Sequence, residues 1–149
     1  MLKNIVFILS DQHNPKISGF EGNSFIRTPN LDSLASQGTA LLNNYCASPL
    51  CIPSRAAMLS GLLPTRTGVI TNFQSLPSDK MTFVHSLGIA GYETVLCGRM
   101  HFKGHDQRHG FMRRLMGDIT NPYIGGGFNL GSLVKADEPS RVSLVKSGP

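Results

Sequence analysis

The residue whose position most favours chemistry is Cys51, which directly precedes a predicted helix that starts at Pro53. Unpaired backbone N–H groups and the positive end of the helix dipole stabilise a negative charge at such a position. Arg55 lies four residues after Cys51 and can reach back over the first turn. The pattern is typical of a nucleophile, or the precursor of one, in an anion-binding pocket. The alternative is a small buried cysteine, the usual role of a free thiol.

Two further polar residues follow an apolar run near the N-terminus. Residues 4–9 are apolar after Asn4, which predicts a strand buried on both faces, as in parallel sheets. Asp11 and His13 lie in the polar turn that ends this run. Because ligands bind at the carboxyl ends of strands in open α/β sheets, Asp11 is a candidate ligand-binding residue and His13 a candidate substrate-pocket residue.

The positive charge of the chain is concentrated in residues 98–114. The formal net charge is +5, and this segment contains five Lys or Arg residues against Asp106 alone, together with three histidines. Such a segment can bind nucleic acid, attract a small anionic substrate, or form a solvated loop. Nucleic-acid binding is therefore one alternative that the composition leaves open.

Three helices and three strands are predicted to position these residues. Helices are expected over residues 28–38, 53–61 and 82–90, because each has a capping residue or proline at its start and glycine near its end. Residues 39–46 and 92–97 are expected to be strands, in addition to residues 4–9. The strand expected over residues 92–97 leads directly into the basic segment.

Length and composition restrict the class of protein. A chain of 149 residues suits one compact domain, and a hydrophobic content of 40% excludes a wholly disordered chain. No apolar run approaches the roughly 20 residues of a membrane helix. The N-terminal apolar stretch is too short for a signal peptide, so we expect a cytoplasmic protein. Three cysteines form no even framework and are expected to be reduced.

The chain resembles the type I sulfatases at several motifs that occur in the family's order. Residues 51–55, CIPSR, resemble the C-x-P-x-R motif of that family, and residues 98–101, GRMH, resemble the end of its second signature, G-K-x-H. Residues 4–12 and 28–32 look like the family's first strand and first helix. The resemblance covers about residues 3–127, and the choline-sulfatase and phosphonate-hydrolase-like branch looks most similar.

This resemblance implies the fold and its extent. It implies the N-terminal part of an alkaline-phosphatase-like α/β fold, with a mostly parallel sheet flanked by helices. Residues 1–117 would form the N-terminal portion of the sulfatase domain, and residues 118–149 a Gly-, Ser- and Pro-rich, weakly ordered continuation of it. The family's remaining metal and catalytic residues lie far downstream. We therefore expect this chain to represent part of a domain that does not turn over substrate alone.

The resemblance also implies a role for each matching residue. A formylglycine-generating enzyme would convert Cys51 to formylglycine, whose hydrate attacks the sulfur of a sulfate ester, and Pro53 and Arg55 belong to the determinant which that enzyme recognises. Arg55 would then stabilise the aldehyde hydrate. His101 would help to expel sulfate, and Arg99 stands where the family usually has lysine. Asp11 and modified Cys51 would bind a divalent cation, Ca²⁺ or else Mg²⁺ or Mn²⁺.

The expected activity is hydrolysis of a small anionic sulfate ester, with neither nucleic acid nor membrane as partner. The alternatives are a phosphate or phosphonate ester hydrolase of the same superfamily, an inactive truncated fragment, and a zinc-binding protein. The zinc alternative would use Cys46, Cys51, Cys97 and His101, although their spacing matches no common zinc motif.

The remaining titratable residues of interest have structural interpretations. His85 is predicted to be a satisfied or exposed helix residue. His105 and His109 are not expected to form a ligand pair, because no helical period supports their spacing, and Asp106 is expected to be a loop residue.

Overall fold

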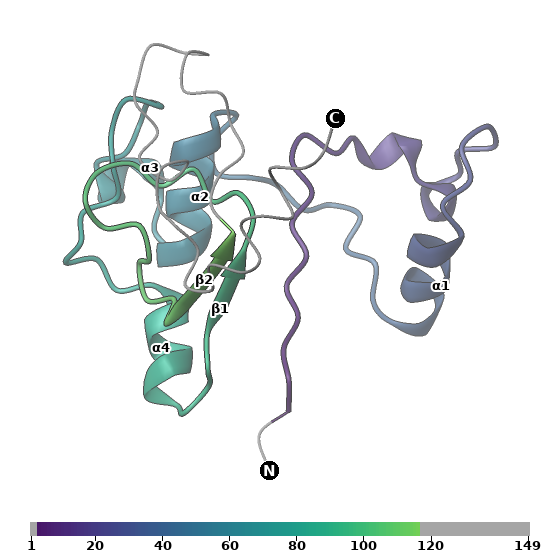
Figure 1. The fold of residues 1–149 in the computed structure, drawn as a ribbon. Helices are drawn as coiled ribbons and strands as arrows, with labels where there is room; N and C mark the ends of the chain where they lie inside the picture. The colour runs from purple at the N-terminus through teal and green to yellow at the C-terminus, as the bar shows by residue number, and fades with distance from the viewer. Residues whose placement is uncertain (1–2, 117–149) are drawn as a thin grey trace, which may run out of the picture. The chain divides into compact units, whose positions relative to one another are not determined.

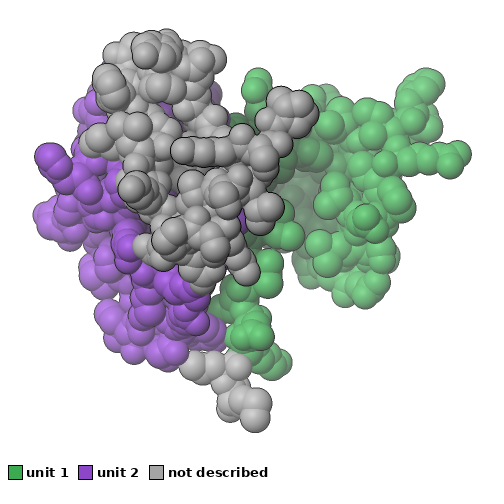
Figure 2. Space-filling view, in the orientation of Figure 1, with its two compact units in different colours: residues 1–45 green, residues 46–149 purple. Residues whose placement is uncertain are grey.

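A computed structural model describes residues 3–116 of the chain. The chain divides into two compact units, unit 1 within residues 1–45 and unit 2 within residues 46–149 (Figures 1 and 2). Among the described residues, every helix is too short or too polar to cross a membrane. The segment 118–149, for which we predict weak order, lies outside the described residues.

Unit 1 is organised around helix α1, Pro29–Gln37, and two single 3-10 turns, Pro15–Ile17 and Gly19–Glu21. The carboxylate of Asp32 accepts hydrogen bonds from the Phe20 N–H and from the Thr28 hydroxyl, each at 2.8 Å. The Thr28 hydroxyl oxygen in turn accepts the Gly19 N–H at 2.8 Å. The helix predicted over residues 28–38 is thus confirmed, and its first turn is joined to the second 3-10 turn by side-chain hydrogen bonds.

The two strands predicted in unit 1 are wrong. Residues 3–10 and 39–46 form neither helix nor strand, and the side chains of Val6 and Ile8 are 82% and 85% exposed. A buried strand needs a paired neighbour and a covered face. The sheet in the described part of the chain has two strands, and neither belongs to unit 1. Apolar composition alone therefore does not produce a strand here.

The described residues of unit 2, 46–116, form three helices and a pair of parallel strands (Figure 1). The elements are α2, Cys51–Ser60; α3, Pro64–Thr67; α4, Phe83–Ile89; β1, Val95–Cys97; and β2, Arg113–Met116. The helices predicted over 53–61 and 82–90 and the strand predicted within 92–97 are confirmed. This α/β arrangement agrees with the fold class expected from the sequence.

The ends of the helices of unit 2 follow from local chemistry. Helix α2 ends at Gly61, whose φ of 70° places it in the left-handed region that glycine adopts without strain. Thr82 caps α4, because its hydroxyl accepts the His85 N–H while His85 Nδ1 accepts the Thr82 N–H at 3.2 Å. His85 is therefore a satisfied helix residue, as predicted.

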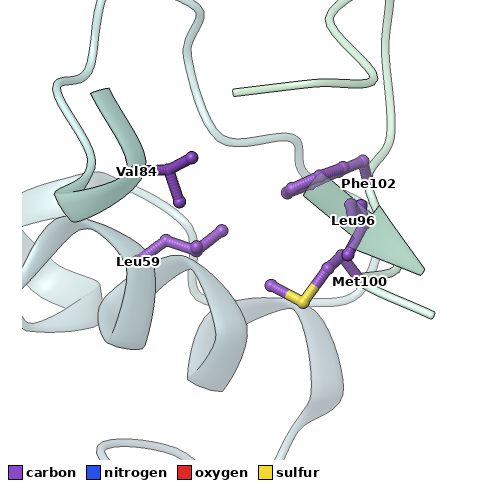
Figure 3. Packing of buried hydrophobic residues seen from close by; sticks show 5 residues of the cluster. All are labelled: Leu59, Val84, Leu96, Met100 and Phe102. Atoms are coloured by element: carbon purple, nitrogen blue, oxygen red, sulfur yellow. The ribbon is translucent and has the colours of Figure 1, made fainter. Parts of the chain in front are cut away.

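Two apolar clusters hold α2 in place. Leu59 of α2 packs with Val84 of α4, Leu96 of β1 and two residues that follow β1, Met100 and Phe102 (Figure 3). The second cluster is formed by Ile52, Ala56, Val69 and Leu76. Because α2 contributes to both clusters, burial of apolar surface fixes the helix that begins with Cys51.

Candidate functional site

Cys51 is the first residue of α2 and is half-buried. It therefore lies in the first turn of the helix, whereas the sequence places it just before the helix. The next backbone N–H, that of Ile52, donates to the side-chain Oδ1 of Asn72 at 2.9 Å. Asn72 thus satisfies one of the unpaired N–H groups at this helix end. No spacing rule in the sequence connects residues 52 and 72, which is why sequence reasoning missed Asn72.

Arg55 connects α2 to the turn that follows β1. The residue is 8% exposed, and its Nη1 donates to the backbone carbonyl of Arg99 at 2.9 Å. The same nitrogen lies 3.8 Å from the sulfur of Met100. The structure therefore brings together three of the predicted site residues, Arg55, Arg99 and His101, within unit 2.

The protonation of His101 follows from its contact with Arg99. Arg99 Nη2 lies 3.0 Å from His101 Nδ1, and a guanidinium donates hydrogen bonds but does not accept them. His101 Nδ1 is consequently the acceptor, so a neutral ring carries its proton on Nε2. In this tautomer Nε2 is the ring atom that carries the transferable proton.

The backbone of His101 is strained. Its φ is 58°, in the left-handed region that costs a non-glycine residue about 1 kcal/mol. Strain of this kind is retained where surrounding contacts impose it, and such residues cluster at functional sites. Here Arg55 holds the carbonyl of Arg99, two residues before His101. The conformation therefore supports a functional role for the turn.

A small cavity lies between α2 and residues 100–103. Arg55, His101 and Lys103 line it, and its other walls are apolar side chains that include Leu59 and Leu76. Arg55, His101 and Lys103 thus border the same small, mostly apolar cavity of unit 2. Lys103 was not among the residues that the sequence singled out as a site residue.

Asp11 and His13 belong to unit 1. Asp11 lies in an exposed turn, and His13 Nε2 lies 3.0 Å from the hydroxyl of Ser18. The structure groups these two residues separately from Cys51, Arg55, Arg99 and His101, all of which belong to unit 2. Within residues 3–116, no three His, Cys, Asp or Glu side chains are grouped so as to hold a metal ion. The described residues therefore do not form a complete cation site.

The segment between the site and β2 contains a buried histidine, His109, whose ring packs on Phe102 with centroids 4.6 Å apart. Its Nδ1 lies 3.3 Å from a carboxylate oxygen of Asp106. Burial lowers the pKa of His109 below its ordinary value of 6.5, although Asp106 acts in the opposite direction. Burial raises the pKa of Asp106, but hydrogen bonds from the His109 and Arg108 N–H groups outweigh it and keep that pKa below 3.8.

A model of the sulfatase family matches residues 3–131 of the chain. The chain is 46% identical over 116 residues to choline-sulfatase of Rhizobium meliloti, covering 78% of this chain and 23% of that protein. It is 37% identical over 129 residues to human steryl-sulfatase, covering 72% of this chain and 22% of that protein. The chain therefore belongs to the sulfatase family.

The structure is also similar to that of BT4656 in complex with its substrate D-glucosamine-2-N,6-O-disulfate. The TM-score is 0.71 at 32% identity, and the match covers 76% of this chain and 23% of that one. The family and the similarity to choline-sulfatase confirm the resemblance drawn from the sequence. The chain spans less than a quarter of the length of these relatives.

Proposed function

We propose that this chain supplies part of the active site of a sulfate-ester hydrolase in which Cys51 is the precursor of the nucleophile. The observation that carries the proposal is the hydrogen bond from Arg55 Nη1 to the carbonyl of Arg99. This bond joins the helix that begins at Cys51 to the strained turn that contains His101. Two segments separated by 44 residues in sequence are thereby held together in unit 2.

Conversion of Cys51 to formylglycine fits the position of this residue. As formylglycine, the residue supplies a hydrated aldehyde whose oxygen attacks the sulfur of a sulfate ester. Cys51 lies at the amino end of a ten-residue helix, where backbone N–H groups favour developing negative charge. Arg55 follows one helical turn later and carries a positive charge.

The burial of the residues after Cys51 constrains when the modification can occur. Ile52, Pro53 and Arg55 are all buried in the folded helix. An enzyme that recognises Pro53 and Arg55 needs access to their side chains. We therefore place the modification before α2 packs against the rest of unit 2.

His101 and Arg99 act as a pair in the proposed site. Arg99 occupies Nδ1 of His101 and so holds the ring in the tautomer that carries a proton on Nε2. His101 can then move that proton at an ester or sulfate oxygen. The positive charge of Arg99 attracts the anionic ester.

Asp11 is the residue of unit 1 that we propose as a metal ligand, with Ca²⁺ as the preferred ion and Mg²⁺ or Mn²⁺ as alternatives. His13, two residues later, is proposed to face the substrate. Because the described residues do not group three potential ligands, no catalytic step is assigned to a metal here.

The names of the relatives indicate two kinds of organic group for the substrate. Choline-sulfatase implies a cationic alcohol for that enzyme, and BT4656 was solved with a disulfated amino sugar. These relatives give no support to the phosphate or phosphonate alternative. We propose a sulfate ester as the substrate and a formylglycine-generating enzyme as the partner of the nascent chain.

Mass spectrometry of the peptide that contains Cys51 tests this proposal. When the chain is expressed together with a formylglycine-generating enzyme, we expect the peptide to lose about 18 Da as the thiol becomes an aldehyde. The peptide that contains Cys97 is an internal control, because Cys97 has no proline or arginine at the corresponding positions. The variant Arg55→Ala should reduce the conversion. An unmodified Cys51 in the presence of the enzyme would contradict the proposal.

A further inference from the structure

Lys103 and Phe73 form a cationic surface beside the proposed site. The Nζ atom of Lys103 lies 5.4 Å from the centroid of the Phe73 ring, and this ring is 75% exposed. A lysine at this distance is attracted by the face of an aromatic ring. Lys103 also lines the cavity that contains Arg55 and His101. Lys103 thus borders the same cavity as Arg55 and His101, and its ammonium group has a defined aromatic neighbour.

The position of Lys103 is fixed by its surroundings on both sides. The buried side chain of Gln107 donates from Nε2 to the carbonyls of Phe102 and Gly104, at 3.3 and 2.8 Å. A Cβ atom on Gly104 would lie 3.4 Å from the side chain of Ser75, so residue 104 approaches the segment that follows Phe73. The loop around Lys103 is therefore held in place before any ligand binds, which reduces the entropic cost of binding.

Phe73 is fixed in the same way at the amino end of α2. It follows Asn72, whose side chain accepts the N–H of Ile52, the residue next to Cys51. The segment that carries Phe73 is therefore attached to the amino end of α2, the end at which the sulfate group of a substrate would approach Cys51.

We infer that Lys103, supported by Phe73, is a specificity-determining residue that selects sulfate esters whose organic part carries a second anionic group. The inference rests on the proposed function. An exposed aromatic ring alone would suit a quaternary ammonium group. Here Lys103 already occupies that ring, and its charge repels a second cation. Within the described residues, no Asp or Glu is within salt-bridge distance of Lys103, so its charge can act on a ligand.

The charge of Lys103 affects the two organic groups that the relatives indicate in opposite ways. A quaternary ammonium group would meet Lys103 with like charge, whereas a second sulfate would form a charge-assisted contact with it. We therefore expect the disulfated sugar to bind more tightly than the choline ester, although the choline-sulfatase relative is 46% identical to this chain.

Binding titrations of the full chain test the inference without requiring turnover. The probes are inorganic sulfate, choline sulfate and D-glucosamine-2-N,6-O-disulfate, and the readout is the NMR shift of the amide signals of residues 51–55 and 101–103. In Lys103→Ala we expect affinity for the disulfate to fall about two- to fivefold, the range of one solvated ion pair. Affinity for choline sulfate should rise, because the ring of Phe73 becomes available to its ammonium group.

Two further variants separate the possible outcomes. Lys80→Ala removes the same charge from a lysine of unit 2 that does not line the cavity, and it should leave the ratio of the two affinities unchanged. Phe73→Ala should shift the ratio of the two affinities in the same direction as Lys103→Ala. Because the side chain of Phe73 is exposed, its removal is not expected to unfold the protein. If Lys103→Ala and Lys80→Ala have equal effects, the inference is wrong although the proposed function stands. If no probe shifts the signals of residues 51–55, the proposed function fails, and the inference with it.

Discussion

Replacing Arg55 by alanine tests whether this residue holds the site together. In the folded protein its Nη1 donates to the carbonyl of Arg99 at 2.9 Å from a side chain that is 8% exposed. A hydrogen bond from a charged donor contributes about 1.5 to 3 kcal/mol, and its loss leaves the carbonyl without this donor. We therefore expect Arg55→Ala to lower the free energy of unfolding by about 2 to 3 kcal/mol.

Urea unfolding followed by circular dichroism measures this loss, since the chain contains no tryptophan that could report by fluorescence. With a urea dependence of about 2 kcal/mol per M, the midpoint should fall by about 1 M or slightly more. The amide of Leu59, buried in the core of unit 2, should lose hydrogen-exchange protection in parallel.

Arg66→Ala is the matched control, because Arg66 is an exposed arginine of the same unit. A substitution at such a surface position should change the free energy of unfolding by less than about 0.5 kcal/mol. If Arg55→Ala were no more destabilising than Arg66→Ala, Arg55 would not hold α2 to the turn at Arg99. The structural basis of the proposed site would then be refuted.

Substitutions at three other positions test separate features of unit 2. Asn72→Ala removes the acceptor of the Ile52 N–H and should lower the free energy of unfolding by about 1 kcal/mol. Asn72→Asp keeps an acceptor oxygen and should retain most of the stability, and thermal melts of the two variants measure the difference. Gly110→Ala should lower the free energy of unfolding by about 2 kcal/mol or more, because φ of Gly110 is 99° and the added Cβ would lie 2.8 Å from the backbone nitrogen of His85. The yield of folded protein and its melting temperature measure this effect. Because the pKa of His109 is lowered in the folded protein, the unfolded chain binds more protons than the folded chain below pH 6.5. The free energy of unfolding of the protein without substitutions should therefore fall as pH decreases through 6.5. His109→Asn should flatten this dependence, and an unchanged pH profile from urea titrations would contradict the assignment.

The helices could be predicted because their signals are local. Thr28 and Thr82 directly precede helices, Pro53 lies in the first turn of α2 and Gly61 follows its last residue, and each of these signals acts within a few residues of its own position. The four candidate residues of unit 2 also follow from motifs, and three of them are joined by contacts from Arg55 to Arg99 and from Arg99 to His101. Neither kind of information depends on distant parts of the chain.

Strand β2, the absence of strands in the described part of unit 1 and the buried charges could not be predicted in this way. Residues 4–9 have a strand-like composition but no strand pairing, while the basic residues of Arg113–Met116 pair with β1 without such a composition. Arg114 is 1% exposed, with Nη1 donating to the carbonyl and Oε1 oxygens of Gln107. Pairing and burial of this kind depend on tertiary partners, which a local pattern does not contain.

The exposed apolar segment of unit 1 determines how the isolated chain behaves at high concentration. The five residues from Ile5 to Leu9 have high β-propensity and contain neither charge nor proline, which is the composition of segments that stack into cross-β assemblies. Most of the net positive charge lies in residues 98–114, so electrostatic repulsion between chains is concentrated away from this segment in sequence. This stretch of five residues therefore limits the concentration at which the protein stays in solution. A charged side chain in place of Val6 would raise that concentration.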